Sequence, residues 1–246
     1  MSDDAIPAAT LIVMREVSGG PPELLMVTRT RSMAFAGGAM VFPGGRVDAQ
    51  DELLGTGIEH GAGRAAAIRE TLEETGLAVA LQPLPDGAGA AQLQAALHAG
   101  TPFADLLGRD GHALEFSALI PFARWKPAFK QPRRFDTLFF LAEAPAGDWP
   151  LRPQAGECEA AEWITAAAVL DRIADGTASA IFPTIRNLER LALFASLAEA
   201  RAQAAAHPLE TITPWIEEAD GEQWLRIPDH LGYPVTRERL HQATRA

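Results

Sequence analysis

Short apolar runs separated by turn-forming residues occupy the first part of the chain, and the period of the pattern then changes. The runs predict strands at residues 9–16, 23–29 and 40–45. The turn sequence SGGPP joins the first two of them. Ala65, Ile68 and Leu72 are then spaced three or four residues apart, and Gly76 follows. This spacing predicts a helix over residues 62–75 that ends at the glycine.

The second half repeats the alternation of strands and helices. Strands are predicted at 115–125, 135–142 and 161–164, helices at 165–174 and 183–206, and a surface hairpin at 211–235. Residues about 78–114 are rich in Pro, Gly and Ala, with a weak helical pattern around 90–98, and we expect an insertion because about thirty residues build little core. The order predicts an α/β protein with a mixed sheet between helices. We expect one domain over residues 1–246, with a C-terminal extension of helices and a hairpin over about 183–246.

Composition narrows the class of protein. The chain has 246 residues, of which 48% are apolar and 22% charged, which is typical of a globular protein and not of a disordered or fibrous one. The net charge of −11 argues against non-specific binding to nucleic acid or to anionic membranes. Cys158 has no second cysteine to pair with, and no apolar run approaches the ~18–20 residues of a membrane span. We therefore expect a cytoplasmic protein with neither nucleic acid nor membrane as a partner.

Three glutamates crowd the end of the predicted helix. At about 100° per residue, Glu70, Glu73 and Glu74 share one helix face, opposite Ile68 and Leu72. Like charges at this spacing repel, and the helix dipole disfavours each anion in the last turn by roughly 0.3–1 kcal/mol. A solvated acidic face is the alternative, but a local rule broken without compensation indicates a functional site. Clustered carboxylates suit Mg²⁺ or Mn²⁺.

The segment around these glutamates resembles a known motif. Residues 69–77, RETLEETGL, resemble the second half of the Nudix box, G-x5-E-x7-R-E-U-x-E-E-x-G-U, where U is bulky and aliphatic. The run Pro43-Gly44-Gly45 resembles its glycine-rich start. The chain departs from the box at Thr71, a usually aliphatic position, and at Gly61, where the box has Glu. Residues 48–57, DAQDELLGTG, lengthen the segment between the two halves.

The resemblance to Nudix hydrolases implies a fold and a set of site residues. The fold is an α/β/α sandwich with a mixed sheet. Its metal ligands for Mg²⁺ (or Mn²⁺) would be Glu70, Glu73, Glu74 and the Gly45 carbonyl. Arg69 would orient the glutamates, and a later acid would act as ligand or base. Glu157 is the first candidate, with Glu159 and Glu162 as alternatives. The implied catalytic set is therefore Arg69, Glu73, Glu74 and Glu157.

A basic segment offers contacts for an anionic substrate. Arg124, Lys126, Lys130, Arg133 and Arg134 fall within residues 124–134, and arginine suits bidentate phosphate contacts. The alternative is a solvated loop that balances local acids.

Four blocks of the chain resemble the coenzyme A diphosphatase-like branch of the family. They are residues 34–51, 66–77, 133–140 and 224–234. In that branch's signature before the box, Arg29 and Gly38 match, whereas Val27 and Ala34 depart. The residues expected to bind substrate are Arg29, Arg46, Arg133 and Arg134.

The function implied is Mg²⁺-dependent hydrolysis of the pyrophosphate bond in a nucleoside diphosphate linked to another moiety, with coenzyme A or acyl-coenzyme A as the best candidate. NADH, ADP-ribose or another nucleotide are alternative substrates. Two other readings stay open: a non-catalytic nucleotide-sensing module, and a structural role for the 183–206 helix. The leucines of that helix either pack on the protein's own core or line a homodimer interface; they are Leu188, Leu191, Leu193 and Leu197.

Overall fold

A mixed β-sheet forms the centre of the computed structural model, which describes residues 5–32, 36–127, 134–219 and 221–243. The described sheet has eight strands in the order β10-β7-β8-β1-β2-β3, with β4 paired to β1 and β9 paired to β2. The strands are β1 (Ile6–Arg15), β2 (Glu23–Arg29), β3 (Met40–Val41), β4 (Gly44–Arg46), β7 (Ile120–Trp125), β8 (Phe135–Glu143), β9 (Cys158–Thr165) and β10 (Thr211–Ile212). The β1–β8 and β10–β7 pairs are parallel and the remaining pairs are antiparallel, so the sheet is mixed as predicted.

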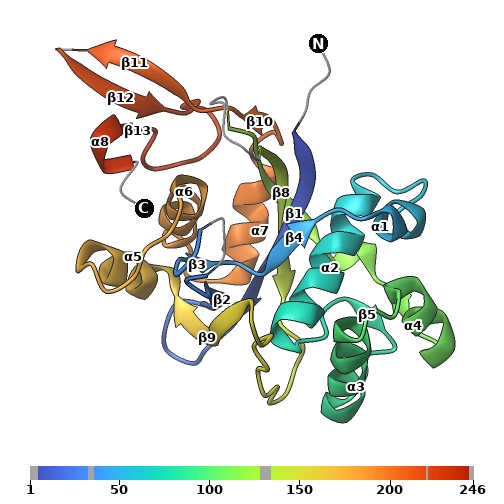
Figure 1. Ribbon diagram of the computed structural model, residues 1–246. Coiled ribbons are helices and arrows are strands. Elements are labelled where there is room, and N and C mark those ends of the chain that lie inside the picture. Colours follow the sequence, from blue (N-terminus) through green and yellow to red (C-terminus); the bar gives the residue numbers. More distant parts are fainter. Residues whose placement is uncertain (1–4, 33–35, 128–133, 220, 244–246) are drawn as a thin grey trace.

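Helices cover both faces of the sheet (Figure 1). Because side chains alternate along a strand, Leu11 and Val13 of β1 enter one apolar core and Ile12 and Met14 enter the other. The first core is shared with α2 (Gly61–Thr75), α3 (Gly87–His98) and α4 (Phe103–Asp110), next to which lies α1 (Ala49–Leu54). The second core is shared with α5 (Ala166–Ala174), α6 (Phe182–Leu191) and α7 (Leu197–Ala205). The predicted α/β sandwich is confirmed.

Two predicted strands differ from the observed ones. The expected strand at 40–45 is divided at Phe42 and Pro43, so that β3 pairs with β2 while β4 pairs with β1. Proline has no N–H for a sheet ladder, and the Pro43 carbonyl instead accepts a hydrogen bond from the Leu11 amide. The strand expected at 115–125 begins only at Ile120, after a 3-10 turn over Phe116–Ala118.

The helix predicted at 183–206 is two helices, α6 and α7. Ser196 starts α7 by accepting a hydrogen bond from the Glu199 amide, which is the capping arrangement of a new helix. Leu188, Leu191 and Leu197 are buried in the protein's own core, whereas Leu193, in the break between the helices, is 59% exposed. Of the two alternatives, packing on the protein's own core therefore holds for Leu188, Leu191 and Leu197 but not for Leu193, and the homodimer stays a prediction.

The segment predicted as an insertion and the C-terminal tail contain the remaining elements. Residues 78–114 fold as α3 and α4, closed by the short antiparallel pair β5 (Leu81–Gln82) and β6 (Ala113–Leu114). The hairpin predicted at 211–235 is confirmed over a shorter range, as β11 (Trp215–Ala219) and β12 (Glu222–Arg226), whereas β10 joins the central sheet. The strand β13 (Arg237–Arg239) pairs with β12 before α8 (Leu240–Ala243). Within the described ranges, no helix has both the length and the apolar composition needed to cross a membrane.

Candidate active site

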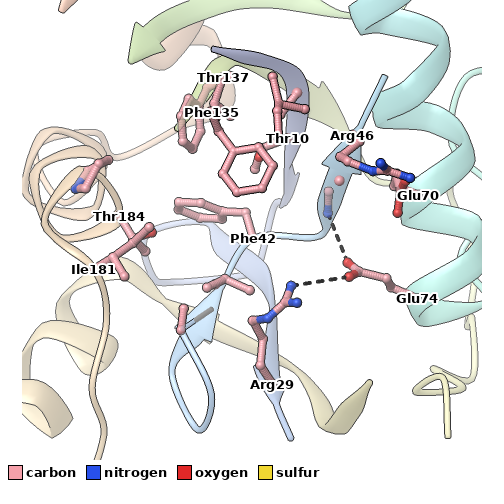
Figure 2. A pocket seen from close by; sticks show the side chains of 18 of the residues that line it. Thr10, Arg29, Phe42, Arg46, Glu70, Glu74, Phe135, Thr137, Ile181 and Thr184 are labelled. Carbon is pink, nitrogen blue, oxygen red and sulfur yellow. Dashed lines mark hydrogen bonds and ion pairs between the residues drawn. The ribbon is translucent and has the colours of Figure 1, made fainter. Parts of the chain in front are cut away.

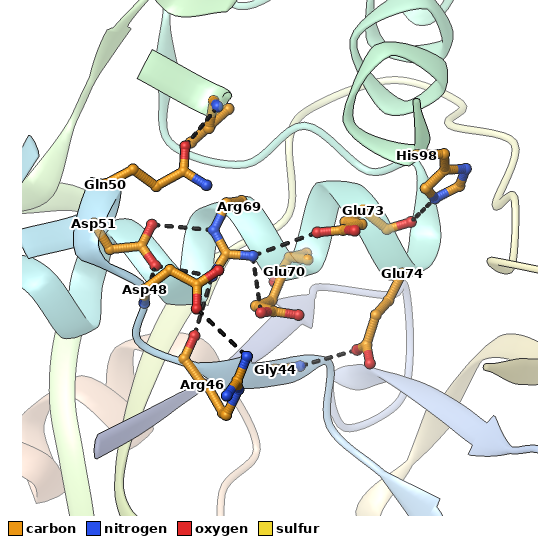
Figure 3. Close-up of polar contacts among 12 residues, drawn as sticks. Gly44, Arg46, Asp48, Gln50, Asp51, Arg69, Glu70, Glu73, Glu74 and His98 are labelled. Atoms are coloured by element: carbon orange, nitrogen blue, oxygen red, sulfur yellow. Dashed lines mark hydrogen bonds and ion pairs between the residues drawn. The ribbon is translucent and has the colours of Figure 1, made fainter. Parts of the chain in front are cut away.

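The acidic end of α2 faces β4. The helix ends as predicted at Gly76, which adopts a φ of 72° and donates its N–H to the Leu72 carbonyl. Ile68 and Leu72 are fully buried on the sheet side. The opposite face carries Glu70, Glu73 and Glu74, whose side chains are 17%, 24% and 3% exposed. The three predicted carboxylates therefore share one face of α2, with Glu74 against Gly44 (Figure 3) and Glu70 against Gly45.

Arg69 lies at the centre of this group (Figure 3). Its Nη1 donates to Glu70 Oε1 at 2.9 Å and to Glu73 Oε2 at 3.4 Å. Its Nη2 donates to the Arg46 carbonyl at 3.0 Å, and both Nε and Nη2 donate to the Asp51 carboxylate. Burial alone would lower the pKa of Arg69, but Asp51 and Glu70 outweigh it and the pKa is raised. The guanidinium is thus a permanent cation that joins α1, β4 and α2.

Burial perturbs two of the glutamates strongly. Burial is the largest cause that raises the pKa of Glu74, to about 8, with the Glu70 charge adding to it. Glu74 Oε2 accepts a hydrogen bond from the Gly44 amide at 2.9 Å, and Glu74 Oε1 lies 3.9 Å from Arg29 Nη1. Burial also raises the pKa of Glu70, to about 7, against the opposing effect of Arg69. Burial therefore disfavours the ionised form of both carboxylates despite the nearby arginines.

Gly45 meets the Glu70 side chain at very close range. A Cβ atom at this position would overlap the Glu70 carboxylate, so no other amino acid fits without displacing that side chain. Gly45 pairs with Ala9 across the β1–β4 ladder, which fixes the backbone of β4 at this point. The glycine of the predicted motif is thus required by the close approach of a backbone segment to a carboxylate.

A cavity of about 1580 Å³ opens next to these carboxylates (Figure 2). Among its described lining residues are five acids, Asp48, Glu70, Glu73, Glu74 and Glu157, and three arginines, Arg29, Arg46 and Arg69. Figure 2 shows Phe135 and Thr137 of the sheet facing Ile181 and Thr184 at the start of α6. Among the described residues, the cavity therefore has an ionic end at α2 and β4 and an uncharged wall from β8 and the C-terminal part.

Of the three described arginines expected to bind substrate, two reach the cavity. Arg29 and Arg46 line it, and the buried Nε of Arg29 has no hydrogen-bond partner. The Arg134 side chain instead donates from Nε to the Pro127 carbonyl at 3.2 Å and is not among the lining residues. Arg133 lies outside the described residues.

The rest of the basic segment is partly committed elsewhere. Arg124 donates from Nε and Nη2 to both oxygens of Asp136, at 2.8 and 2.7 Å, so here the alternative reading of local charge balance holds. Lys130 lies outside the described residues.

The three candidate later acids occupy different environments. Glu157 lines the cavity, and its charge raises the pKa of Glu74. Glu159 accepts a hydrogen bond from the Arg31 amide at 3.4 Å. Glu162 accepts two hydrogen bonds from Arg172, at 2.7 and 3.0 Å. The geometry favours Glu157, the first candidate of the sequence.

The sequence did not reveal the residues that support α2 from outside the motif. Gln94 Nε2 donates to the Glu73 carbonyl at 3.0 Å and to the Arg152 carbonyl at 2.8 Å. His98 Nε2 donates to the same Glu73 carbonyl at 2.8 Å. The insertion thus satisfies a carbonyl in the last turn of α2, and Asp51, also missed, holds Arg69. Asp48 and Asp51 have the spacing of a helix cap, which is the signal that the sequence offered.

Comparison with solved structures decides the family. The chain is similar to a Nudix hydrolase from Alicyclobacillus acidocaldarius whose crystal structure is known. The two sequences are 31% identical and the two structures align with a TM-score of 0.71, over 82% of this chain and 97% of that one. The chain belongs to the Nudix hydrolase family. Nudix hydrolases cleave pyrophosphate bonds in nucleotide derivatives, so this Nudix hydrolase is a pyrophosphohydrolase. No family model matches the sequence, and a search of curated proteins finds no match.

More distant Nudix structures align with the same chain at lower similarity. The Nudix domain of Shewanella oneidensis NrtR in complex with ADP ribose is 13% identical, with a TM-score of 0.41, over 69% of this chain and 79% of that one. A binary complex of the Caenorhabditis elegans Ap4A hydrolase is 17% identical, with a TM-score of 0.39, over 70% and 87% of the two chains.

Nudix hydrolases generally use divalent metal ions. In the described part of the chain, no three His, Cys, Asp or Glu side chains are already arranged as a set of metal ligands. Glu70 and Glu73 are held by Arg69, and Glu74 is held by the Gly44 amide. All three carboxylates therefore already take part in hydrogen bonds within the protein.

Proposed function

We propose that this Nudix hydrolase binds Mg²⁺ or Mn²⁺ through Glu70, Glu73, Glu74 and the Gly45 carbonyl, and hydrolyses coenzyme A or acyl-coenzyme A at the pyrophosphate bond. The observation that carries the metal is the charge of the cavity. Its described lining holds five acids and three arginines, a net charge of −2 when all are ionised. With all five carboxylates ionised, as metal ligands must be, such a lining would repel a pyrophosphate anion unless divalent cations were bound.

The residues present fit a divalent ion. Oxygen ligands are those that Mg²⁺ and Mn²⁺ prefer, and burial, with a neighbouring glutamate adding to it, raises the pKa values of Glu70 and Glu74, an effect that a bound cation would oppose. The missing Cβ of Gly45 leaves the backbone of β4 against the Glu70 carboxylate. Backbone and side-chain oxygens can therefore converge on one ion.

The reaction is an attack of water on phosphorus. A bond forms between the water oxygen and one phosphorus atom, and the bond from that phosphorus to the bridging oxygen breaks. Held by the three glutamates and the Gly45 carbonyl, divalent ions would neutralise the phosphate oxygens and stabilise the leaving phosphate. The proton of the attacking water passes to a carboxylate of the chain, Glu157 or Glu73. Arg29, whose Nε is unpartnered, donates to a phosphate oxygen.

The size and the uncharged wall of the cavity support a large substrate with an apolar part. Drug-sized ligands occupy pockets of roughly 300–1000 Å³, and this cavity exceeds that range at about 1580 Å³. The described wall contributed by β7, β8 and the C-terminal part is uncharged and includes Trp125, Phe135, Phe139, Phe182 and Leu225. A nucleotide linked to a pantetheine or acyl-pantetheine arm matches a cavity with one ionic end and one apolar wall. A nucleotide linked to a second charged group or to a sugar matches it less well.

Product analysis tests the proposal. The protein is incubated with coenzyme A, acyl-coenzyme A, NADH, ADP-ribose and nucleoside triphosphates, in Mg²⁺ and in Mn²⁺, and products are separated by chromatography. We expect phosphopantetheine, free or acylated, together with adenosine 3′,5′-bisphosphate, and no product in EDTA. Faster turnover of ADP-ribose or NADH would reject the coenzyme A assignment. Full activity of Glu74→Gln would reject the metal site itself.

A further inference from the structure

We infer that Asp51, in the segment that lengthens the Nudix motif, is a positioning residue that aims Arg69 and thereby sets the geometry of the metal-binding carboxylates. This inference rests on the metal site proposed above. Asp51 touches neither substrate nor metal in this account. It acts through the guanidinium, from a helix that the motif does not contain.

The contacts between Asp51 and Arg69 are extensive and buried. Asp51 Oδ1 accepts from Nε at 3.1 Å and Oδ2 accepts from Nη2 at 2.8 Å, which is the bidentate fork arrangement. Asp51 is completely buried, and the Arg69 side chain is 5% exposed. The fork fixes the plane of the guanidinium, because two parallel hydrogen bonds allow no rotation about either one.

This orientation of the Arg69 guanidinium leaves one nitrogen, Nη1, to contact the acidic face of α2. With Nε and Nη2 occupied by Asp51 and the Arg46 carbonyl, Nη1 alone contacts Glu70 and Glu73. The contact to Arg46 also ties Arg69 to the residue after Gly45. Asp51 therefore determines the position of Arg69 Nη1 relative to two proposed metal ligands, Glu70 and Glu73. It also fixes Arg69 relative to β4, the strand that carries a third proposed ligand, the Gly45 carbonyl.

The fold explains why the carboxylate comes from α1. Gly61, at the position where the Nudix box has Glu, packs against the backbone of Gly55, and a Cβ on either glycine would overlap the other segment. No side chain can therefore occupy position 61 while α1 folds back on the start of α2. The same packing brings Asp51 onto Arg69, so the segment that excludes one carboxylate supplies another.

Manganese binding without substrate tests the inference. The dissociation constant for Mn²⁺ is measured by electron paramagnetic resonance for the wild type, Asp51→Asn and Glu52→Gln, with circular dichroism to establish folding. Asparagine keeps an oxygen for the Asp48 amide, which caps α1, but removes the charge and places an amide against the guanidinium. Glu52→Gln removes an exposed carboxylate of the same helix. We expect about a 10–100-fold weaker affinity for Asp51→Asn, and an affinity within twofold of wild type for Glu52→Gln.

The outcomes separate this inference from the proposed function. A folded Asp51→Asn protein that binds Mn²⁺ as tightly as the wild type would overturn the inference alone. A wild type that binds no Mn²⁺ would overturn the proposed metal site first. If Asp51→Asn does not fold, Asp51→Glu is measured instead. This variant keeps the negative charge, but its side chain is longer by one methylene group and therefore displaces the Arg69 guanidinium. We expect its affinity for Mn²⁺ to be at least threefold weaker than that of the wild type. An unchanged affinity for Mn²⁺ would overturn the inference.

Discussion

Stability of the metal-free protein should fall as the pH rises, because two buried carboxylates on α2 resist ionisation. The folded-state pKa of Glu74 is about 8 and that of Glu70 about 7, both above the ordinary value of 4.5. Between about pH 5 and pH 8 the folded protein therefore holds protons that the unfolded chain has released. The stabilisation is complete below pH 4.5 and is lost as the pH rises through the folded-state values.

The magnitude is large compared with the stability of an ordinary domain. Each unit of pKa shift corresponds to about 1.4 kcal/mol, so the rise from 4.5 to about 8 at Glu74 would cost on the order of 5 kcal/mol by pH 8.5. Total free energies of unfolding are typically about 5–15 kcal/mol. A bound divalent ion should reverse this loss, since metal ligands bind as carboxylates and metal affinity rises with pH.

Urea denaturation at pH 5.5, 7.0 and 8.5, in EDTA and in Mg²⁺, measures both effects. We expect Glu74→Gln to lose much of the pH slope in EDTA and most of the stabilisation by Mg²⁺. Glu189→Gln is the matched control: burial also raises the pKa of Glu189, to about 7, but this residue lies on α6. It should lose its own share of the slope and keep the full Mg²⁺ effect. A Glu74→Gln protein with the slope of the wild type would refute the reasoning.

Three further substitutions test individual contacts. Gly45→Ala should push the Glu70 carboxylate aside and lower kcat about 100-fold, as measured by product release, with little change in melting temperature. Gln94→Leu removes the donor shared by two backbone carbonyls, one of them that of Glu73, and should cost about 1–3 kcal/mol in urea denaturation. Glu157→Gln should lower kcat by about 10²–10⁴-fold and remove the acidic limb of the pH profile, if this residue is the base. Unchanged kcat would assign that role to Glu73.

The sequence predicts the elements whose signal is local and repeated. Helix α2 follows from apolar positions three and four residues apart, and its end follows from Gly76, whose left-handed backbone suits glycine. The acidic face is visible because three like charges on one helix turn oppose local stability. Two rows of apolar residues with a turn between them likewise predict β1 and β2.

The elements that the sequence does not predict depend on distant contacts. Helix α1 has six residues and α4 eight, too short to form without tertiary support. Specific tertiary contacts support both helices. Asp51 of α1 binds Arg69, and the Gln50 side chain of α1 accepts a hydrogen bond from the Phe103 amide at the start of α4. The partner of Asp51 lies 18 residues away, so no local pattern shows that this one aspartate is buried and paired.

Anomalous diffraction from a crystal grown with Mn²⁺ and a non-hydrolysable nucleotide analogue tests the central claim most directly. The account predicts a manganese peak within bonding distance of the Glu70 and Glu74 carboxylates and the Gly45 carbonyl, with Arg69 still bound to Asp51. A nucleotide-bound crystal with no such peak, and with Glu74 still on the Gly44 amide, would contradict it.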